Sequence, residues 1–109
     1  MYFNVFRNRK APGFDAQAYA ADAQRMEALA RAQKGFIDFR RYMAEDGEAL
    51  SISEWETAED ARAWQRHPEH AAVQARARTG YYESYVVYSC DDPQVRRFEA
   101  RKADGTSKP

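Results

Sequence analysis

Both tryptophans and both histidines of this 109-residue chain lie within one stretch, residues 51–77. An indole offers a flat aromatic face, and an imidazole, with an unperturbed pKa of about 6.5, can accept a proton at neutral pH. Trp64 and His70 are the two best placed for such chemistry, because helical spacing puts each on the inward-facing stripe of a predicted helix. The stretch therefore predicts that an aromatic wall and a proton acceptor face the same neighbourhood.

The hydrophobic period changes in the middle of this stretch, which places a strand before two helical segments. Residues 51–56 alternate like a strand, and Thr57 with Asp60 has the pattern of a capping box. Pro68 ends the first helical segment and begins a second, because proline is tolerated at the first helical position. At this break His67 is expected to be a helix cap or a surface residue.

Alternation and turn residues predict the remaining elements. The predicted strands are, in chain order, residues 1–10, 36–44, 49–56 and 81–90. Asp15 begins a helix that runs to about residue 33, and Gly35 and Gly47 are turn residues after the helix and the second strand. Residues 94–100 are expected to pair briefly along a sheet edge. The polar residues 101–109 are expected to form a disordered tail.

The order of the elements is strand, helix, strand, strand, broken helix, strand, which is the split βαβ arrangement of a ferredoxin-like fold. We therefore predict one α+β domain, residues 1–100, with an antiparallel sheet and helices on one face. The second and fourth strands carry bulky apolar residues on both faces, and the chain has only nine Leu, Ile and Val residues. Since its own helices cover one face only, the sequence predicts a homodimer packed sheet against sheet.

Charge and cysteine content narrow the classes of partner. The formal net charge is zero, with 17 residues of each sign, so no electrostatic footprint for nucleic acid or an anionic membrane is present. No apolar run approaches the roughly 20 residues that a membrane-spanning helix needs. Cys90 is the one cysteine, which argues against a disulfide framework or a metal-ligand cluster, and it is expected to be inert. The expected location is cytoplasmic.

Strict alternation assigns the strand side chains to faces. On the first strand Asn4, Phe6 and Asn8 share one face, where amides beside an aromatic ring suit a cavity wall as well as an ordinary half-solvated surface. On the second strand alternation sets Phe36, Asp38, Arg40 and Tyr42 against Ile37, Phe39, Arg41 and Met43. On the fourth it sets Tyr82, Ser84, Val86 and Tyr88 against Tyr81, Glu83, Tyr85 and Val87.

With this order of elements, the chain resembles the antibiotic biosynthesis monooxygenase (ABM) family of dimeric α+β barrels. The strand-to-helix passage Ser53-Glu-Trp-Glu-Thr-Ala-Glu-Asp-Ala-Arg-Ala-Trp64, the His67-Pro-Glu-His-Ala segment and the Arg78-Thr-Gly-Tyr-Tyr-Glu-Ser-Tyr segment carry the resemblance. Residues 6–9 and 34–39 also look like family positions. The resemblance covers residues 1 to about 100 and implies a homodimer. The family includes cofactor-independent oxygenases, haem-degrading enzymes and members without an assigned activity.

The haem-degrading branch is similar in having an Asn on the first strand, a Trp on the second helix and a haem-ligating His about ten positions later. Asn8 and Trp64 match the first two roles. Gln74 stands at the third position, and amide side chains are not usual haem ligands. His70 lies one helical turn earlier, and would replace that ligand only after an axial shift of the helix. The resemblance to this branch therefore implies no haem.

The cofactor-independent branch implies oxidation of a small phenol or quinol by O₂ without a metal or an organic cofactor. Such a site must bind an aromatic ring, remove a proton and hold the developing negative charge. The resemblance then assigns His70 as general base, with Trp64 and Asn8 beside it as catalytic residues. The substrate-binding candidates are Asn4, Phe6, Arg41, Arg78 and Tyr82.

Each candidate also has a structural interpretation. Trp64 suits a core position, and Trp55 suits packing or a dimer contact. His70 suits a partly buried, hydrogen-bonded histidine, and Arg41 an ion pair at an interface. The alternative function is accordingly a non-catalytic dimer that binds a small ligand or acts as a regulatory module.

Overall fold

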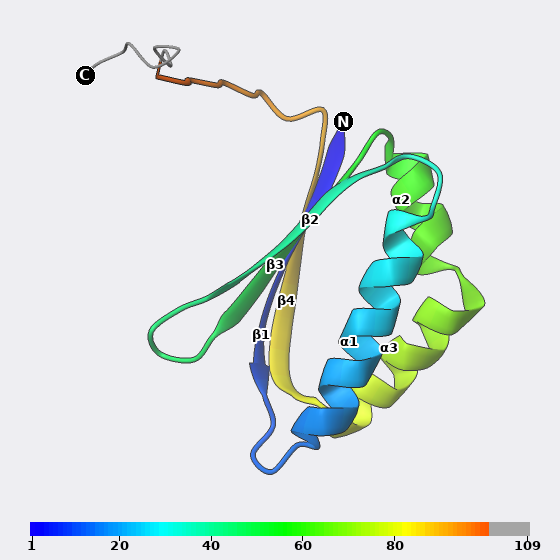
Figure 1. Ribbon diagram of the computed structural model, residues 1–109, viewed down its shortest axis with the longest axis vertical. Helices are drawn as coiled ribbons and strands as arrows, with labels where there is room; N and C mark the ends of the chain where they lie inside the picture. The colour runs from blue at the N-terminus through cyan, green and yellow to red at the C-terminus, as the bar shows by residue number, and fades with distance from the viewer. Residues whose placement is uncertain (101–109) are drawn as a thin grey trace, which may run out of the picture.

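The computed structural model describes residues 1–100, and all three helices lie on one side of a twisted antiparallel sheet (Figure 1). The elements are, in chain order, β1 (Tyr2–Lys10), α1 (Ala16–Arg31), β2 (Phe36–Met43), β3 (Ala49–Trp55), α2 (Ala58–Gln65), α3 (Pro68–Gly80) and β4 (Tyr82–Asp91). The strand order is β2-β3-β1-β4, with every pairing antiparallel. The predicted ferredoxin-like α+β fold is confirmed. The tail at residues 101–109 lies outside the described residues.

Side-chain caps begin all three helices at the positions where the sequence signals them. The Asp15 carboxylate accepts from the backbone N–H of Ala18 at 3.0 Å, and Thr57 Oγ1 accepts from that of Asp60 at 3.0 Å. His67 Nδ1 accepts from the N–H of Glu69 at 3.2 Å, directly before Pro68. The predicted break between two helical segments is therefore confirmed, with His67 as the cap of the second.

Gly35 lies where the chain turns from α1 into β2. Its φ is +81°, a left-handed conformation that residues with a Cβ rarely adopt. A Cβ at this position would also overlap the carboxylate of Asp60. Both the backbone conformation and the close approach of α2 therefore require glycine here.

Two β-bulges change the facing of the outer strands relative to strict alternation. The β1–β4 register passes from Arg9↔Ser84 to Lys10↔Tyr82, so Glu83 is an extra residue in β4. Tyr82 and Tyr85 consequently lie on the same face, toward the helices, and the predicted alternation in β4 is wrong at this point. A second shift, between Phe36 and Asp38, likewise disturbs the predicted alternation at the start of β2.

The cluster of buried hydrophobic side chains is small and lies at one end of the sheet, and Ala77 and Tyr81 are buried outside it. Trp55 is 1% exposed and packs with Ala30, Ala61 and Trp64. The half-buried side chains that surround this core are Tyr2, Met26, Leu29 and Phe36. Of the two roles predicted for Trp55, packing is confirmed, since its indole contacts the Phe36 ring edge-on at 5.6 Å. Aromatic volume thus replaces the missing aliphatic side chains.

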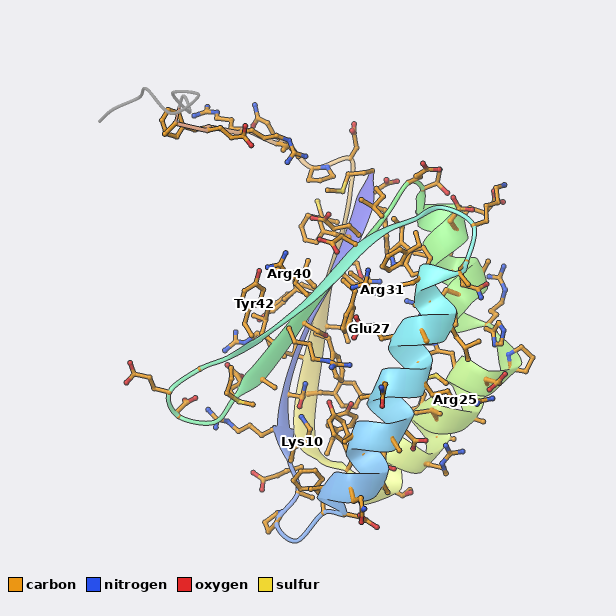
Figure 2. The ribbon with its side chains drawn as sticks, viewed as in Figure 1. Lys10, Arg25, Glu27, Arg31, Arg40 and Tyr42 are labelled. Carbon is orange, nitrogen blue, oxygen red and sulfur yellow. The ribbon has the colours of Figure 1, made fainter. Side chains whose placement is uncertain are left out.

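The opposite face of the sheet has no covering element within residues 1–100. Figure 2 shows Arg40 and Tyr42 on this open face, on the side of the sheet away from α1. Tyr42, Val86 and Tyr88 are 52%, 41% and 51% exposed. Residues 93–100 form no strand and extend away from the sheet (Figure 1), so the predicted edge pairing of residues 94–100 is wrong. Among the described helices, none has the length and apolar character that crossing a membrane requires.

Candidate functional site

Four aromatic rings meet on the helix-facing side of the sheet, and we call Phe6, Tyr19, Tyr82 and Tyr85 the aromatic cluster. The Phe6 ring lies 5.4 Å from that of Tyr82 and 5.2 Å from that of Tyr85. Tyr19 meets Tyr82 edge-on at 6.3 Å. These centroid distances are those of favourable aromatic pairs. Phe6 and Tyr82 were predicted ligand contacts, and the structure brings them together.

Three elements position this cluster. The central strand β1 supplies Phe6, and the bulge at Glu83 in β4 turns both Tyr82 and Tyr85 toward it. Helix α1 supplies Tyr19, whose ring also contacts that of Tyr81 at 5.4 Å. The cluster therefore depends on one helix and on a local irregularity of the sheet.

Asn8 lies beside the cluster and is the one buried polar residue of the described chain, at 4% exposure. Its Oδ1 accepts a hydrogen bond from Nζ of Lys10. The same ammonium lies 4.6 Å from the centroid of the Tyr19 ring and 5.4 Å from that of Tyr82. Asn8 thus connects the aromatic cluster to a positive charge.

Trp64 and His70 form a second group at the Trp55 end of the sheet. Their rings stack with centroids 4.5 Å apart and planes inclined by 23°. His70 Nδ1 is buried without a hydrogen-bond partner among residues 1–100. Burial lowers the pKa of the His70 imidazole below its ordinary value of 6.5. The imidazole is therefore neutral at pH 7 and keeps a basic nitrogen.

The two groups lie along the same side of β1 but at different ends. Tyr2 packs on the core that contains Trp64, whereas Asn8 is farther along the strand. At a rise of about 3.4 Å per residue, Tyr2 and Asn8 are roughly 20 Å apart. The predicted residues therefore form two groups on one face.

The remaining predicted contacts are distributed more widely. Arg41 faces α1, with Nη2 at 3.4 Å from the carbonyl of Ala23 and 3.7 Å from Oε1 of Glu27. Figure 2 labels Glu27 on the side of α1 that faces the sheet. Asn4 Oδ1 accepts from the hydroxyl of Ser89. Arg78 is exposed on α3 and forms no ion pair with a described residue.

Sequence reasoning missed three residues of this region: Lys10, Tyr19 and Tyr85. Lys10 continues the alternation of Asn4, Phe6 and Asn8, so its facing was available from the sequence. Tyr19 lies within the helix predicted to begin at Asp15, but it received no role. Tyr85 was hidden by the bulge, which alternation alone cannot locate.

The environment of the cluster keeps the Tyr82 phenol neutral. Burial first, and the neighbouring Tyr19 second, raise the pKa of the Tyr82 phenol above its usual value. Tyr82 therefore presents a hydrogen-bonding hydroxyl and a ring rather than a charge.

Gln74, at the position where the haem-degrading branch has its ligand, is exposed on α3. Within residues 1–100, no group of three or more His, Cys, Asp or Glu residues could hold a metal ion.

The antiparallel β2-β3-β1-β4 sheet with its helices on one face defines a ferredoxin-like α+β protein, and solved structures share this fold. Rv0793 from Mycobacterium tuberculosis is 17% identical, with a TM-score of 0.71 over 92% of this chain and 98% of that one. SnoaB from Streptomyces nogalater, described as a cofactor-independent oxygenase, is 14% identical, with a TM-score of 0.71 over 86% of this chain and 94% of SnoaB.

Sequence comparison identifies the family. The antibiotic biosynthesis monooxygenase model matches residues 1–76. The uncharacterized protein YqjZ of Bacillus subtilis (strain 168) is 31% identical over 86 residues, which are 79% of this chain and 75% of YqjZ. The chain belongs to the antibiotic biosynthesis monooxygenase family.

Proposed function

We propose that this protein is a cofactor-independent monooxygenase that oxidises a small phenol, hydroquinone or anthrone with O₂. The observation that carries the proposal is the aromatic cluster beside the buried Asn8, on the helix-facing side of an ABM fold. Tyr85 of this cluster is 45% exposed, so a flat aromatic substrate can pack against its ring. A buried amide suits the oxygen of that substrate.

The reaction is balanced without an external reductant. A base removes a proton, and the resulting carbanion-like anion passes an electron to O₂. The superoxide formed combines with the substrate radical, and the O–O bond of the peroxide then breaks. One oxygen atom remains as a carbonyl, and the other leaves as water with two hydrogens of the substrate. The substrate supplies all four electrons, so the protein must only bind the ring, take the proton and stabilise charge.

His70 is the proposed base, because its buried imidazole is neutral at pH 7 and Nδ1 has no partner in the described chain. Trp64, whose ring stacks on that of His70, would form an aromatic wall of the site. Asn8 and Asn4 would donate to substrate oxygens, and Phe6 and Tyr82 would contact the ring. Arg41, which already pairs with Glu27 at 3.7 Å, or the exposed Arg78 stays a prediction as the countercharge. Because Tyr2 and Asn8 lie roughly 20 Å apart along β1, His70 can take the proton only of a ring that binds at the Trp64 end of the sheet.

The fold shared with SnoaB and the residue Gln74 support cofactor independence. SnoaB, which shares the fold, is described as a cofactor-independent oxygenase. Gln74 does not fit the role of a haem ligand, since an amide side chain is not a usual axial ligand. We therefore derive no haem-dependent step for this chain.

The proposed active protein is a homodimer that covers the open face of each sheet. Tyr42, Val86 and Tyr88 on that face are about half exposed, and no described element covers them. Exposed apolar surface of this kind marks an interaction site. Two copies packed sheet against sheet would bury it and would complete an α+β barrel. We keep the cytoplasmic location as a prediction.

A non-catalytic ligand-binding dimer is the second candidate. The separation of the Trp64–His70 group from Asn8 and Tyr82 favours it, because a base distant from the bound ring cannot take its proton. In this case the aromatic cluster would bind a ligand without turning it over.

Oxygen uptake distinguishes the two candidates. Purified protein is assayed with a panel of anthrones and hydroquinones, with chelator present and flavin absent. We expect uptake above the spontaneous rate, and a loss of about 10²–10⁴-fold in the His70→Ala variant, which is typical for a general base. Arg62→Ala, an exposed change on α2, is the matched control. Ligand binding without uptake would establish the second candidate, and full activity in His70→Ala would exclude His70 as base.

A further inference from the structure

Lys10, the last residue of β1, carries a charge that no assigned role uses. Figure 2 labels it beside the end of β1, between the sheet and α1. Its Nζ donates to Asn8 Oδ1 and lies over the rings of Tyr19 and Tyr82, at 4.6 and 5.4 Å. Every ion pair within residues 1–100 involves an arginine, so no described carboxylate lies within 4.0 Å of this ammonium.

The other charges near the aromatic cluster already have partners. On β2, Arg41 pairs with Glu27 of α1 at 3.7 Å. On α1, Asp22 accepts from Arg76 of α3 at 3.0 Å and from the Tyr81 hydroxyl at 2.7 Å. Lys10 is therefore the cation beside the cluster that lacks an anionic partner within the described residues.

The groups that contact the Lys10 ammonium are uncharged, so they do not neutralise its charge. An ammonium has three donors, and Asn8 accepts one of them. The Tyr19 and Tyr82 rings attract the cation through their π faces but leave its net charge unchanged. A partly buried cation with free donors favours a nearby anion, and it lowers the pKa of an acid that binds there.

We propose that Lys10, held by Asn8, Tyr19 and Tyr82, forms an anion subsite that binds the ionised oxygen of a phenolic ligand. The ring of the ligand would then contact Phe6 and Tyr82. The choice of a phenol as the ligand class rests on the proposed function. The subsite deepens that function, because the phenolate is the form of the substrate that gives an electron to O₂.

The test uses 4-nitrophenol, whose ionised form has a distinct absorbance, and 4-nitroanisole, a neutral analogue with a methylated oxygen. Both are titrated into the full-length protein under nitrogen. We expect the wild type to lower the apparent pKa of bound nitrophenol below that of the free probe. Lys10→Met should remove this shift and weaken nitrophenolate binding at least tenfold, while binding of nitroanisole is retained. Lys10→Arg should keep the shift.

Lys34→Met is the matched control, because Lys34 is an exposed lysine after α1, and it should leave both titrations unchanged. Circular dichroism checks that each variant folds. If Lys10→Met does not fold, the pKa shift of nitrophenol bound to the wild type still tests the subsite. Absence of nitrophenol binding, absence of a shift in the wild type, or a shift that survives in Lys10→Met would overturn the proposal.

The binding test is separate from catalysis. A pKa shift that depends on Lys10, in a protein without oxygen uptake, would support the subsite and refute the oxygenase activity. Oxygen uptake without any such shift would leave the oxygenase activity intact and refute the subsite.

Discussion

The indole of Trp64 and the imidazole of His70 stack at 4.5 Å across the break between α2 and α3. Trp64 belongs to the core with Trp55, whereas His70 has a buried nitrogen without a partner in the described chain. The contact between Trp64 and His70 therefore links the hydrophobic core to the proposed base. Substitutions at these two residues need separate measurements of stability and activity.

Replacing Trp64 with alanine is expected to destabilise the protein by about 3–5 kcal/mol, because the truncation leaves a cavity beside Trp55. Urea unfolding followed by circular dichroism measures the change. Arg62→Ala, on the exposed side of the same helix, should change the free energy of unfolding by less than about 0.5 kcal/mol. A small loss of stability in Trp64→Ala, together with lost ligand binding, would make Trp64 a site wall rather than a core residue.

Stability is expected to fall as the pH drops below about 6.5. The folded pKa of His70 is lowered, so the unfolded chain binds a proton over a range where the folded protein does not. The free energy of unfolding therefore rises with pH between the lowered pKa and 6.5, and this contribution is constant above it. Melting temperatures at pH 7.5 and 5.5 measure the effect. His70→Phe keeps an aromatic ring and should show a smaller drop; an equal drop would assign the dependence to other groups.

Gly35→Ala is expected to destabilise by more than about 1 kcal/mol, because an L-residue at φ +81° is strained and its Cβ meets Asp60. Gly80, at the end of α3, has open space around its Cα, so Gly80→Ala is the control and should be neutral or slightly stabilising. Combining Gly35→Ala with Asp60→Ala should recover part of the loss. No recovery in this double mutant would assign the cost to backbone strain alone.

Light scattering at micromolar concentration should give the mass of a dimer. We expect the interface of this dimer to bury more than roughly 2,000 Å² in total. Val86→Glu places a charge on the open face and should give a monomer. Val87→Glu changes the next residue of the same strand, on the opposite face, and should leave the dimer intact. A monomeric wild type, or equal effects of the two substitutions, would contradict dimerisation through the open face.

The sequence alone determined the order of the elements and their caps. Asp15, Thr57 and His67 carry local hydrogen-bond signals that act within three residues, so they can be recognised without the fold. The proline at the start of α3 works in the same local way. The sequence also predicted packing or a dimer contact for Trp55, and the structure places it in the core.

Only the tertiary structure decided the composition of the candidate site. The extra residue Glu83 turns Tyr85 beside Tyr82, and a bulge depends on pairing between strands that are far apart in the sequence. The position of Trp64 relative to Asn8 depends on where α2 crosses the sheet, which no local pattern encodes. The same limit applies to Lys10. Local alternation along β1 predicts which face its side chain lies on. Its lack of an anionic partner among the described residues, however, results from how α1, β2 and α3 pair their own charges.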